Sequence, residues 1–201
     1  MPRPSLTDEQ RRETRRSIRN AAAKLFAENG SKNLSVREIA KSAGVSVGTV
    51  YAHFKNLTEL MQSLWKKPVS RLITELSDIF DSTEDPSTRI EILLHCYLDF
   101  SVAQQPVYRG AFMFVRPESH DKPTPVSLDQ DRLYSLFYKT IIEGQEKGLF
   151  REGNPNLITQ NIWSGLHGAI ALPINVDRLA LTPSKKNAGN MIDLLLEWLR
   201  S

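Results

Sequence analysis

The chain has 201 residues, of which 40% are hydrophobic and 24% charged, which excludes a disordered chain, a collagen-like repeat and a disulfide-rich scaffold. No apolar run approaches the roughly 18 residues of a membrane span, so we expect neither a span nor a secretory signal, and expect a cytoplasmic protein. The net charge of +3 divides unevenly: residues 1–67 hold 13 Lys+Arg against 6 Asp+Glu, giving +7, whereas the remainder holds 13 against 17, giving −4.

Arginines crowd the basic N-terminal end of the chain. The cluster consists of Arg3, Arg11, Arg12, Arg15, Arg16 and Arg19. Such guanidinium groups can bind phosphates or another anionic surface, although a solvated helix face produces the same pattern. The cluster alone leaves both interpretations open.

Three helices are predicted within the first 54 residues, because a capping signal precedes each of them. The predicted caps are Thr7 with Gln10, Ser35 with Glu38, and Ser46. Gly30 supplies a stop for the first helix. Gly44 stands where a tight turn after the second helix requires a positive φ.

The segment 35–54 has the spacing of a helix-turn-helix. Ala40 stands where the two helices cross, and Gly44 stands at the turn. Val50 and Phe54 lie one turn apart on the second helix and must face the core. These coincident constraints predict the motif.

The remaining residues of the third helix face solvent or a partner: Val47, Gly48, Thr49, Tyr51, Ala52 and His53. Gly48 disfavours a helix by about 1 kcal/mol relative to alanine, and close approach of a duplex is the compensation we expect. Thr49, Tyr51 and His53 can donate hydrogen bonds to phosphate oxygens. Taken singly, each is also an ordinary surface residue, but together they favour DNA.

A long fourth helix is predicted from Asn56-x-x-Glu59 to Phe80. Pro68 lies inside this helix and should kink it or split it near Lys67, because proline removes a backbone donor and clashes one turn back.

Further helices are predicted beyond Ser82, each after a cap or an N1 proline. Their signals are Asp85-Pro86, Ser127-x-x-Gln130, Asn154-Pro155 and Thr182-Pro183. Gln105-Pro106 should end one helix and begin a shorter one over 108–115, and 118–126 should be a loop. No segment alternates with period two. We therefore predict an all-α fold, with an N-terminal three-helix helix-turn-helix domain over 1–57 and a larger helical domain over 58–201.

The N-terminal residues closely resemble the signature of the TetR family of transcription regulators. The matching residues are Ile18-x-x-Ala21-Ala22-x-x-Leu25-Phe26-Ala27-Glu28-Asn29-Gly30 and Ser35-Val36-Arg37-Glu38-Ile39-Ala40-x-x-Ala43-Gly44-Val45-Ser46-x-Gly48-Thr49-x-Tyr51-x-His53-Phe54. They cover about a quarter of the chain. The resemblance implies a homodimeric regulator, a repressor that a small-molecule effector releases from a palindromic DNA operator.

The resemblance also assigns positions to the DNA-binding residues, which are Ser35, Arg37, Ser46, Val47, Gly48, Thr49, Tyr51, His53 and Lys55. Ser35 and Arg37 would lie at the groove entrance, and Val47 and Ala52 would face bases. The residues that would contact phosphates are Thr49, Tyr51, His53 and Lys55. Where the family usually has a lysine, this chain has Leu57. Lys55 or the N-terminus of the fourth helix would then supply that phosphate contact.

The C-terminal half carries a further resemblance. Trp163-x-x-x-His167-Gly168 is similar to a stretch on the penultimate helix of one TetR subgroup. That helix and the last one should form a four-helix interface with a second copy of the chain, although the same apolar residues could cap the core of one protomer. The expected interface residues are Trp163, Ile192, Leu195, Leu196, Trp198 and Leu199.

An effector cavity is expected within the larger domain, lined by inward-facing aromatic and sulfur-bearing residues, each of which could equally be core. The candidates are Trp65, Tyr97, Phe100, Phe112, Met113, Phe137, Ile141, Trp163 and His167. No cofactor is expected. Nor is a metal, since no His/Cys spacing demands one. Cys96 is expected to be a small core residue, with a redox-sensing thiol as the alternative.

Two other classes of protein compete with this interpretation. An enzyme is disfavoured, because the chain has no Gly-rich phosphate loop, no nucleophile elbow and no paired His-x-x-x-His. A non-specific DNA-coating protein would differ from an operator reader in binding all sequences about equally.

Overall fold

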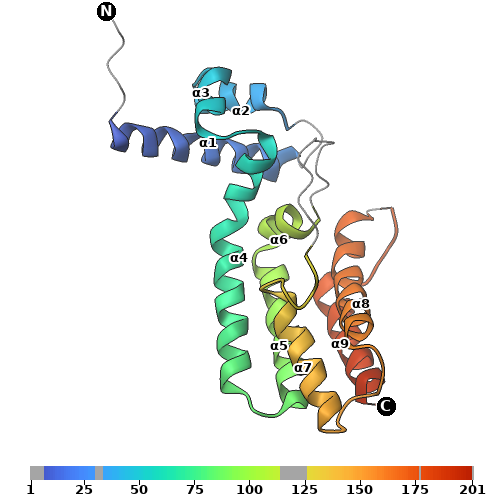
Figure 1. The fold of residues 1–201 in the computed structure, drawn as a ribbon. Coiled ribbons are helices and arrows are strands. Elements are labelled where there is room, and N and C mark those ends of the chain that lie inside the picture. Colours follow the sequence, from blue (N-terminus) through green and yellow to red (C-terminus); the bar gives the residue numbers. More distant parts are fainter. Residues whose placement is uncertain (1–6, 30–33, 114–125, 177, 201) are drawn as a thin grey trace, which may run out of the picture. The chain divides into compact units, whose positions relative to one another are not determined.

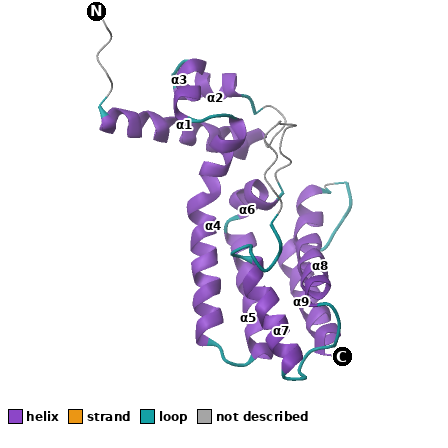
Figure 2. Ribbon diagram, in the orientation of Figure 1, coloured by secondary structure: helices purple, strands orange, loops and turns teal. Residues whose placement is uncertain are grey.

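The computed structural model describes residues 7–29, 34–113, 126–176 and 178–200, and within these ranges it contains nine α-helices and no strand (Figures 1 and 2). The helices are α1 (Asp8–Asn29), α2 (Val36–Ala43), α3 (Val47–His53), α4 (Leu57–Ser82), α5 (Pro86–Ala103), α6 (Gln105–Phe112), α7 (Tyr134–Glu146), α8 (Pro155–Asn175) and α9 (Ser184–Arg200). The prediction of an all-α fold is confirmed. No helix in the described ranges is long and apolar enough to span a bilayer.

The chain divides into two compact units, one formed by Met1–Pro68 and Arg109–Ser119, the other by Val69–Tyr108 and His120–Ser201. The division falls at Pro68, inside α4, eleven residues after the boundary predicted at Leu57. The beginning of α4 belongs to the first unit because its side chains pack there. The Trp65 and Phe26 rings, for example, lie 5.2 Å apart.

The caps predicted for the first unit are confirmed. Ser35 Oγ accepts a hydrogen bond from the Glu38 amide at 3.2 Å, and Ser46 Oγ accepts one from the Thr49 amide at 3.0 Å. Gly44 follows α2 at a φ of 68°, the left-handed conformation that its predicted turn requires. The hydrogen bonds that begin α2 and α3 are thus local to the sequence.

The signals predicted for the second unit are confirmed at three helices and wrong at one, and α9 begins at Ser184, directly after Thr182-Pro183. Asp85 and Asn154 cap α5 and α8. Ser127 does not begin a helix, because 127–133 form turns, and α7 starts at Tyr134. Asp131 caps that start, since its carboxylate accepts from the Leu133 and Tyr134 amides at 2.9 and 3.1 Å.

Two other predictions about helix boundaries need correction. Of the two outcomes predicted for Pro68, a split does not occur, since α4 runs through the proline. The helix expected over 108–115 is α6, which begins at Gln105, because Pro106 is tolerated in a first turn. Residues 118–125 of the expected loop lie outside the described ranges.

Helices α5, α7, α8 and α9 pack together in the second unit (Figure 1). Their buried core is mainly aliphatic and includes Ile90, Leu93, Ile141, Ile162, Leu166 and Ile192. The buried guanidinium of Arg89 on α5 forms an ion pair with Glu143 on α7. Arg89 Nη1 lies 2.6 Å from Glu143 Oε2, and Arg89 Nε donates to the Thr83 carbonyl at 2.6 Å. The pairing offsets the desolvation of the buried guanidinium.

Candidate nucleic-acid interface and internal cavity

Helix α3 presents an exposed side that matches the predicted DNA face. Tyr51 is 54% exposed and Val47 is 36% exposed, whereas Val50 and Phe54 are each 2% exposed. The two apolar side chains therefore anchor the helix, as predicted, and leave its other side free. Ser35, Arg37, Ser46, Gly48 and Lys55 are also exposed, and Thr49 and His53 are half-buried.

Gly48 has no internal reason to be glycine. A Cβ built there would meet only Ser46 Oγ, at an ordinary 3.7 Å. Alanine would therefore fit inside the protein and would favour the helix by about 1 kcal/mol.

The first turn of α3 gathers two hydroxyl groups. Ser46 Oγ and Thr49 Oγ1 lie 2.8 Å apart and share a hydrogen bond, while the serine oxygen also caps the helix. A helix N-terminus with free amides and hydroxyl groups is suited to contact with an anion. The arrangement is chemically compatible with phosphate oxygens.

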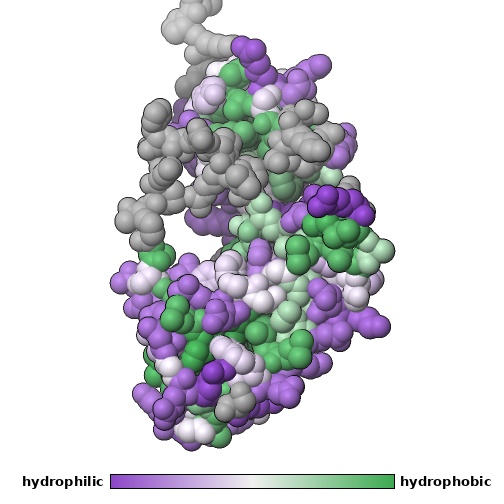
Figure 3. Space-filling model, turned by 90° about the vertical axis from the view of Figure 1, so that its right-hand side faces the viewer, coloured by the Kyte–Doolittle hydropathy of each residue, from purple (hydrophilic) through white to green (hydrophobic). Residues whose placement is uncertain are grey.

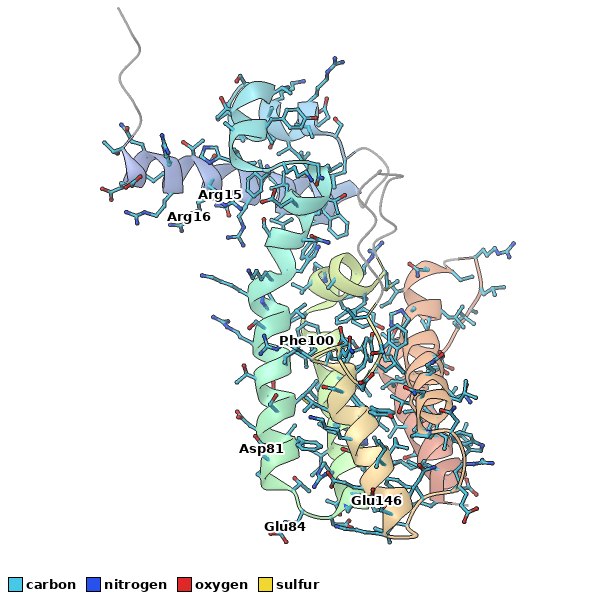
Figure 4. The ribbon with its side chains drawn as sticks, in the orientation of Figure 1. Arg15, Arg16, Asp81, Glu84, Phe100 and Glu146 are labelled. Atoms are coloured by element: carbon cyan, nitrogen blue, oxygen red, sulfur yellow. The ribbon has the colours of Figure 1, made fainter. Side chains whose placement is uncertain are left out.

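Arg15 ties α1 to the end of α3. Its guanidinium donates to the His53 carbonyl and lies 4.0 Å from the centre of the Phe54 ring. It also forms an ion pair with Glu59, with Nη2 and Oε1 3.7 Å apart. The sequence left open whether Arg15 binds phosphate or lies on a solvated helix face; in the structure its guanidinium contacts the end of α3 and Glu59. Arg16, by contrast, is exposed on α1 (Figure 4).

His53 sits in a basic environment. Partial burial lowers the pKa of its imidazole, and the positive charges of Arg15 and Arg11 lower the pKa further. The side chain is therefore neutral at pH 7 and can still donate one hydrogen bond. A nearby phosphate would raise the same pKa.

At the start of α4, this chain has Leu57 where the TetR family usually has a lysine. Leu57 is half-buried at the first position of the helix. Asn56 Oδ1 accepts from the Glu59 amide at 2.8 Å, and Glu59 Oε2 accepts from the Lys55 amide at 2.7 Å. This capping box places a carboxylate at the helix N-terminus, which opposes an incoming phosphate there and leaves Lys55 as the better donor.

The second unit contains a small cavity of about 10 Å³. Its lining residues are Ile90, Leu94, Tyr97, Tyr134, Phe137, Ile141, Thr159, Ile162, Trp163 and Leu166. Four predicted residues line it: Tyr97, Phe137, Ile141 and Trp163. Trp65, Phe100, Phe112, Met113 and His167 do not. Trp65 belongs to the first unit, where it packs on Phe26, because its position on α4 precedes Pro68.

Two tyrosines at this centre were absent from the predicted set. Tyr134 lines the cavity, and Tyr108 is fully buried beside it. The Tyr108 hydroxyl shares a hydrogen bond with His167 Nδ1 at 2.6 Å. The signal for Tyr134 was its spacing, three residues before Phe137 on the same helix.

The predicted dimer residues separate into two sets. Ile192, Leu196 and Leu199 are at most 5% exposed within a single protomer, as in the alternative in which these residues cap the core of one protomer. These three residues lie on the side of α9 that packs into the core of the second unit. Trp163, Leu195 and Trp198 are half-buried, and the Trp198 ring lies under the Arg151 guanidinium at 4.3 Å.

The exposed leucines of α8 and α9 lie elsewhere on these helices. Leu157 and Leu172 on α8 are 57% and 55% exposed, and Leu194 on α9 is 59% exposed. Figure 3, which views the side of the molecule where α8 and α9 lie in Figure 1, shows apolar surface between polar residues. By contrast, exposed carboxylates at Asp81, Glu84 and Glu146 mark the end of the second unit where α4 and α7 terminate (Figure 4).

Residues 18–64 match the family model described as bacterial regulatory proteins, tetR family. The N-terminal domain is therefore of the tetR type. The match runs into the beginning of α4, consistent with the division at Pro68.

Curated protein sequences resemble this chain over part of its length. An HTH-type transcriptional regulator of Staphylococcus aureus is 32% identical over 90 residues, which are 45% of this chain and 49% of that protein. The chain thus spans about half the length of the curated relatives it matches.

Solved structures resemble it over nearly its whole length. The fatty acid degradation regulator FadR from Bacillus halodurans has a TM-score of 0.65 at 23% identity, covering 92% of this chain and 99% of FadR. The TetR family regulator PfmR from Thermus thermophilus has a TM-score of 0.63 at 19% identity, with the same coverage of 92% and 99%. The fold downstream of the tetR-type domain is thus also found among TetR regulators.

Proposed function

We propose that the protein is a sequence-specific DNA-binding transcription regulator, which acts as a homodimeric repressor released from a palindromic operator by a small-molecule effector. The observation that carries the proposal is the outer side of α3. A Cβ at Gly48 would meet only Ser46 Oγ, at an ordinary contact distance, and the exposed Tyr51 lies three residues along the helix. A recognition helix in the major groove needs such a side, with close backbone approach and flanking donors.

Electrostatics support the same function. The basic segment 1–67 carries a charge of +7, and Arg37 and Lys55 are exposed on either side of α3. Phosphate neutralisation by such residues supplies sequence-independent affinity, and base contacts from α3 would supply the preference. The tetR-type domain and the regulators it resembles agree with this assignment.

A homodimer would present two recognition helices to two half-sites about 34 Å apart. We propose that the interface lies along an exposed side of α8 formed by Leu157, Asn161, Ser164, Gly168 and Leu172. These residues are spaced three to four apart, and a Cβ at Gly168 would meet nothing within 4 Å. Small residues flanked by leucines allow another helix to approach closely.

Helix α6 offers a covalent route by which the cavity could influence the DNA-binding unit. Tyr108 belongs to the second unit, where it bonds to His167, and Gly110 belongs to the first, where it packs against Trp65. Tyr108 and Gly110 lie two residues apart on the same helix, so a shift at Tyr108 would be transmitted to Gly110. An effector would act by binding more tightly to a conformation in which α6 is shifted.

The experiment is a binding titration of the full chain on labelled DNA from upstream of its own gene, with a shuffled duplex of equal length as control. An operator reader should bind one segment at least about a thousandfold more tightly than the shuffled duplex. Equal affinity for both would favour the DNA-coating alternative. No binding to any duplex at low salt would reject both.

A further inference from the structure

The first part of α1, residues 8–17, extends beyond the packed part of its unit. None of these side chains is buried, whereas Ile18 and Ala22 further along the helix are 0% exposed. A capping box begins the segment, since Thr7 Oγ1 accepts from the Gln10 amide at 3.2 Å and Gln10 Oε1 accepts from the Thr7 amide at 2.9 Å. The segment is thus helical without burying a side chain of its own.

The buried side of α1 continues into this segment as two arginines. Arg15 stands three residues before the buried Ile18, and Arg11 stands four residues before Arg15, so all three share one side of the helix. Arg15 shows where that side points, because its guanidinium donates to the His53 carbonyl at the end of α3. Arg11 lies one turn further from the core on the same side, and hence beside the end of α3.

The Arg11 side chain is exposed, and its guanidinium forms no hydrogen bond or ion pair with another residue that the structure describes. Burial and the charge of Arg15 lower the pKa of the His53 imidazole, and the charge of Arg11 lowers it further. The unpaired cation therefore lies near a residue of the predicted DNA face. A cation and an imidazole that disfavour each other's charge in the free protein both gain from an anion beside them.

DNA phosphates are anions that fit this position. His53 lies at the end of α3 that Arg15 contacts, so Arg11 continues the set of candidate phosphate donors from α3 onto α1. A guanidinium binds phosphate oxygens through paired N–H donors, and each such contact on DNA releases counterions. Contacts of this kind position a protein on the duplex without reading its sequence.

Arg16 provides a comparison on the same helix. Its side chain is also exposed on α1 (Figure 4), and it too forms no hydrogen bond or ion pair within the described part of the chain. Five residues separate it from Arg11, which places it roughly 140° around the helix. The arginine charges that lower the pKa of His53 are those of Arg15 and Arg11. Arg16 therefore carries the same charge on a different side of α1.

We propose that Arg11 is a phosphate-binding residue, which extends the DNA interface from α3 onto the N-terminal part of α1 and contacts a backbone phosphate next to the one that His53 contacts. The proposal rests on the proposed function of DNA binding. Because a phosphate contact is independent of sequence, Arg11 contributes equally to the binding of the operator and of a shuffled duplex.

The first test compares Arg11→Ala with Arg16→Ala in the full chain, because the two variants lose the same charge from the same helix. Affinity for the upstream duplex and for the shuffled duplex is measured at several salt concentrations, and circular dichroism verifies that each variant is folded. Arg11→Ala should weaken both about tenfold and reduce the slope of log affinity against log salt by about 0.9 per bound protomer. Arg16→Ala should leave the slope unchanged and weaken binding by at most about twofold, because salt screens a distant charge.

A second measurement identifies the phosphate. A series of upstream duplexes carries one uncharged methylphosphonate at a time in place of a phosphate. One of these substitutions should weaken wild-type binding about tenfold but Arg11→Ala binding by at most about twofold, because the variant has already lost that contact. The same substitution should still weaken the binding of Arg16→Ala about tenfold.

The placement of Arg11 is tested without DNA by NMR titration of the imidazoles. The pKa of His53 should rise in Arg11→Ala and stay unchanged in Arg16→Ala. Three results would overturn the proposal: an unchanged His53 pKa in Arg11→Ala, an unchanged salt slope in that variant, or no methylphosphonate that distinguishes it from the wild type. Each of them leaves the proposed function standing if the wild-type chain still prefers the upstream duplex. A wild-type chain that binds no duplex rejects both.

Discussion

Gly110 on α6 lies directly against the indole of Trp65 on α4. A Cβ built on Gly110 would stand 2.1 Å from Trp65 Cζ2, so the pair packs closely only because residue 110 has no side chain. Trp65 packs in turn on Phe26 of α1. One glycine thus decides how closely α6 and α4 approach within the first unit.

Gly110→Ala should therefore destabilise the fold. Overpacking of this kind costs about 1–3 kcal/mol, which exceeds the gain of about 1 kcal/mol from alanine in a helix. The free energy of unfolding in urea measures the effect. Gly189→Ala on α9 is the control, because a Cβ there meets nothing within 4 Å, and its stability should stay the same or rise.

Gly48→Ala should separate stability from DNA binding. The methyl group has room within the protein, so unfolding should require the same free energy or about 1 kcal/mol more. If α3 lies in a groove at this residue, affinity for the operator should fall about tenfold or more, a loss of about 1.4 kcal/mol. Unchanged affinity would show that the backbone of α3 does not approach DNA at Gly48.

Tyr51 and Lys55 should contribute to DNA binding in distinguishable ways. Tyr51→Phe removes an exposed hydroxyl and should weaken binding about tenfold without changing the salt dependence, because no charge is lost. Lys55→Ala should reduce the slope of log affinity against log salt by about 0.9, the value for one phosphate contact. Titrations at several salt concentrations test both, and an unaltered slope for Lys55→Ala would exclude that contact.

His53 should make DNA binding dependent on pH. In the free protein, burial and two arginines lower the pKa of its imidazole below 6.5, whereas a phosphate would raise it. Binding would then take up a proton, so affinity should rise as the pH falls from 8 to 6. His53→Gln retains a donor but cannot titrate, and its affinity should change less over this range. An identical pH profile for both proteins would place His53 away from phosphate.

Leu172→Glu should disrupt the proposed dimer. A carboxylate at this exposed position on α8 would be buried unpaired in a symmetric interface, which costs several kcal/mol. Light scattering should show a shift from dimer to monomer at micromolar concentration. Val102→Glu, at an exposed position on α5, is the control and should remain dimeric. A dimeric Leu172→Glu protein would locate the interface elsewhere.

The sequence alone predicted those features that depend on a few neighbouring residues. The caps at Ser35 and Ser46 and the left-handed Gly44 are confirmed, because each involves hydrogen bonds over three or four residues. The same local reasoning was wrong at Ser127, which would have begun a helix at residue 128. The carboxylate of Asp131 accepts hydrogen bonds from two amides instead, and α7 begins six residues later, at Tyr134.

Only the tertiary structure decided what each apolar side chain contacts. The pattern of α9 is identical whether Ile192 and Leu199 face their own core or a second copy, since helical spacing identifies a face but not its partner. The same limit applies to the aromatic residues. Trp65 and Tyr134 are both large side chains on amphipathic helices, yet only Tyr134 lines the cavity, because helix packing between distant segments determines which faces meet.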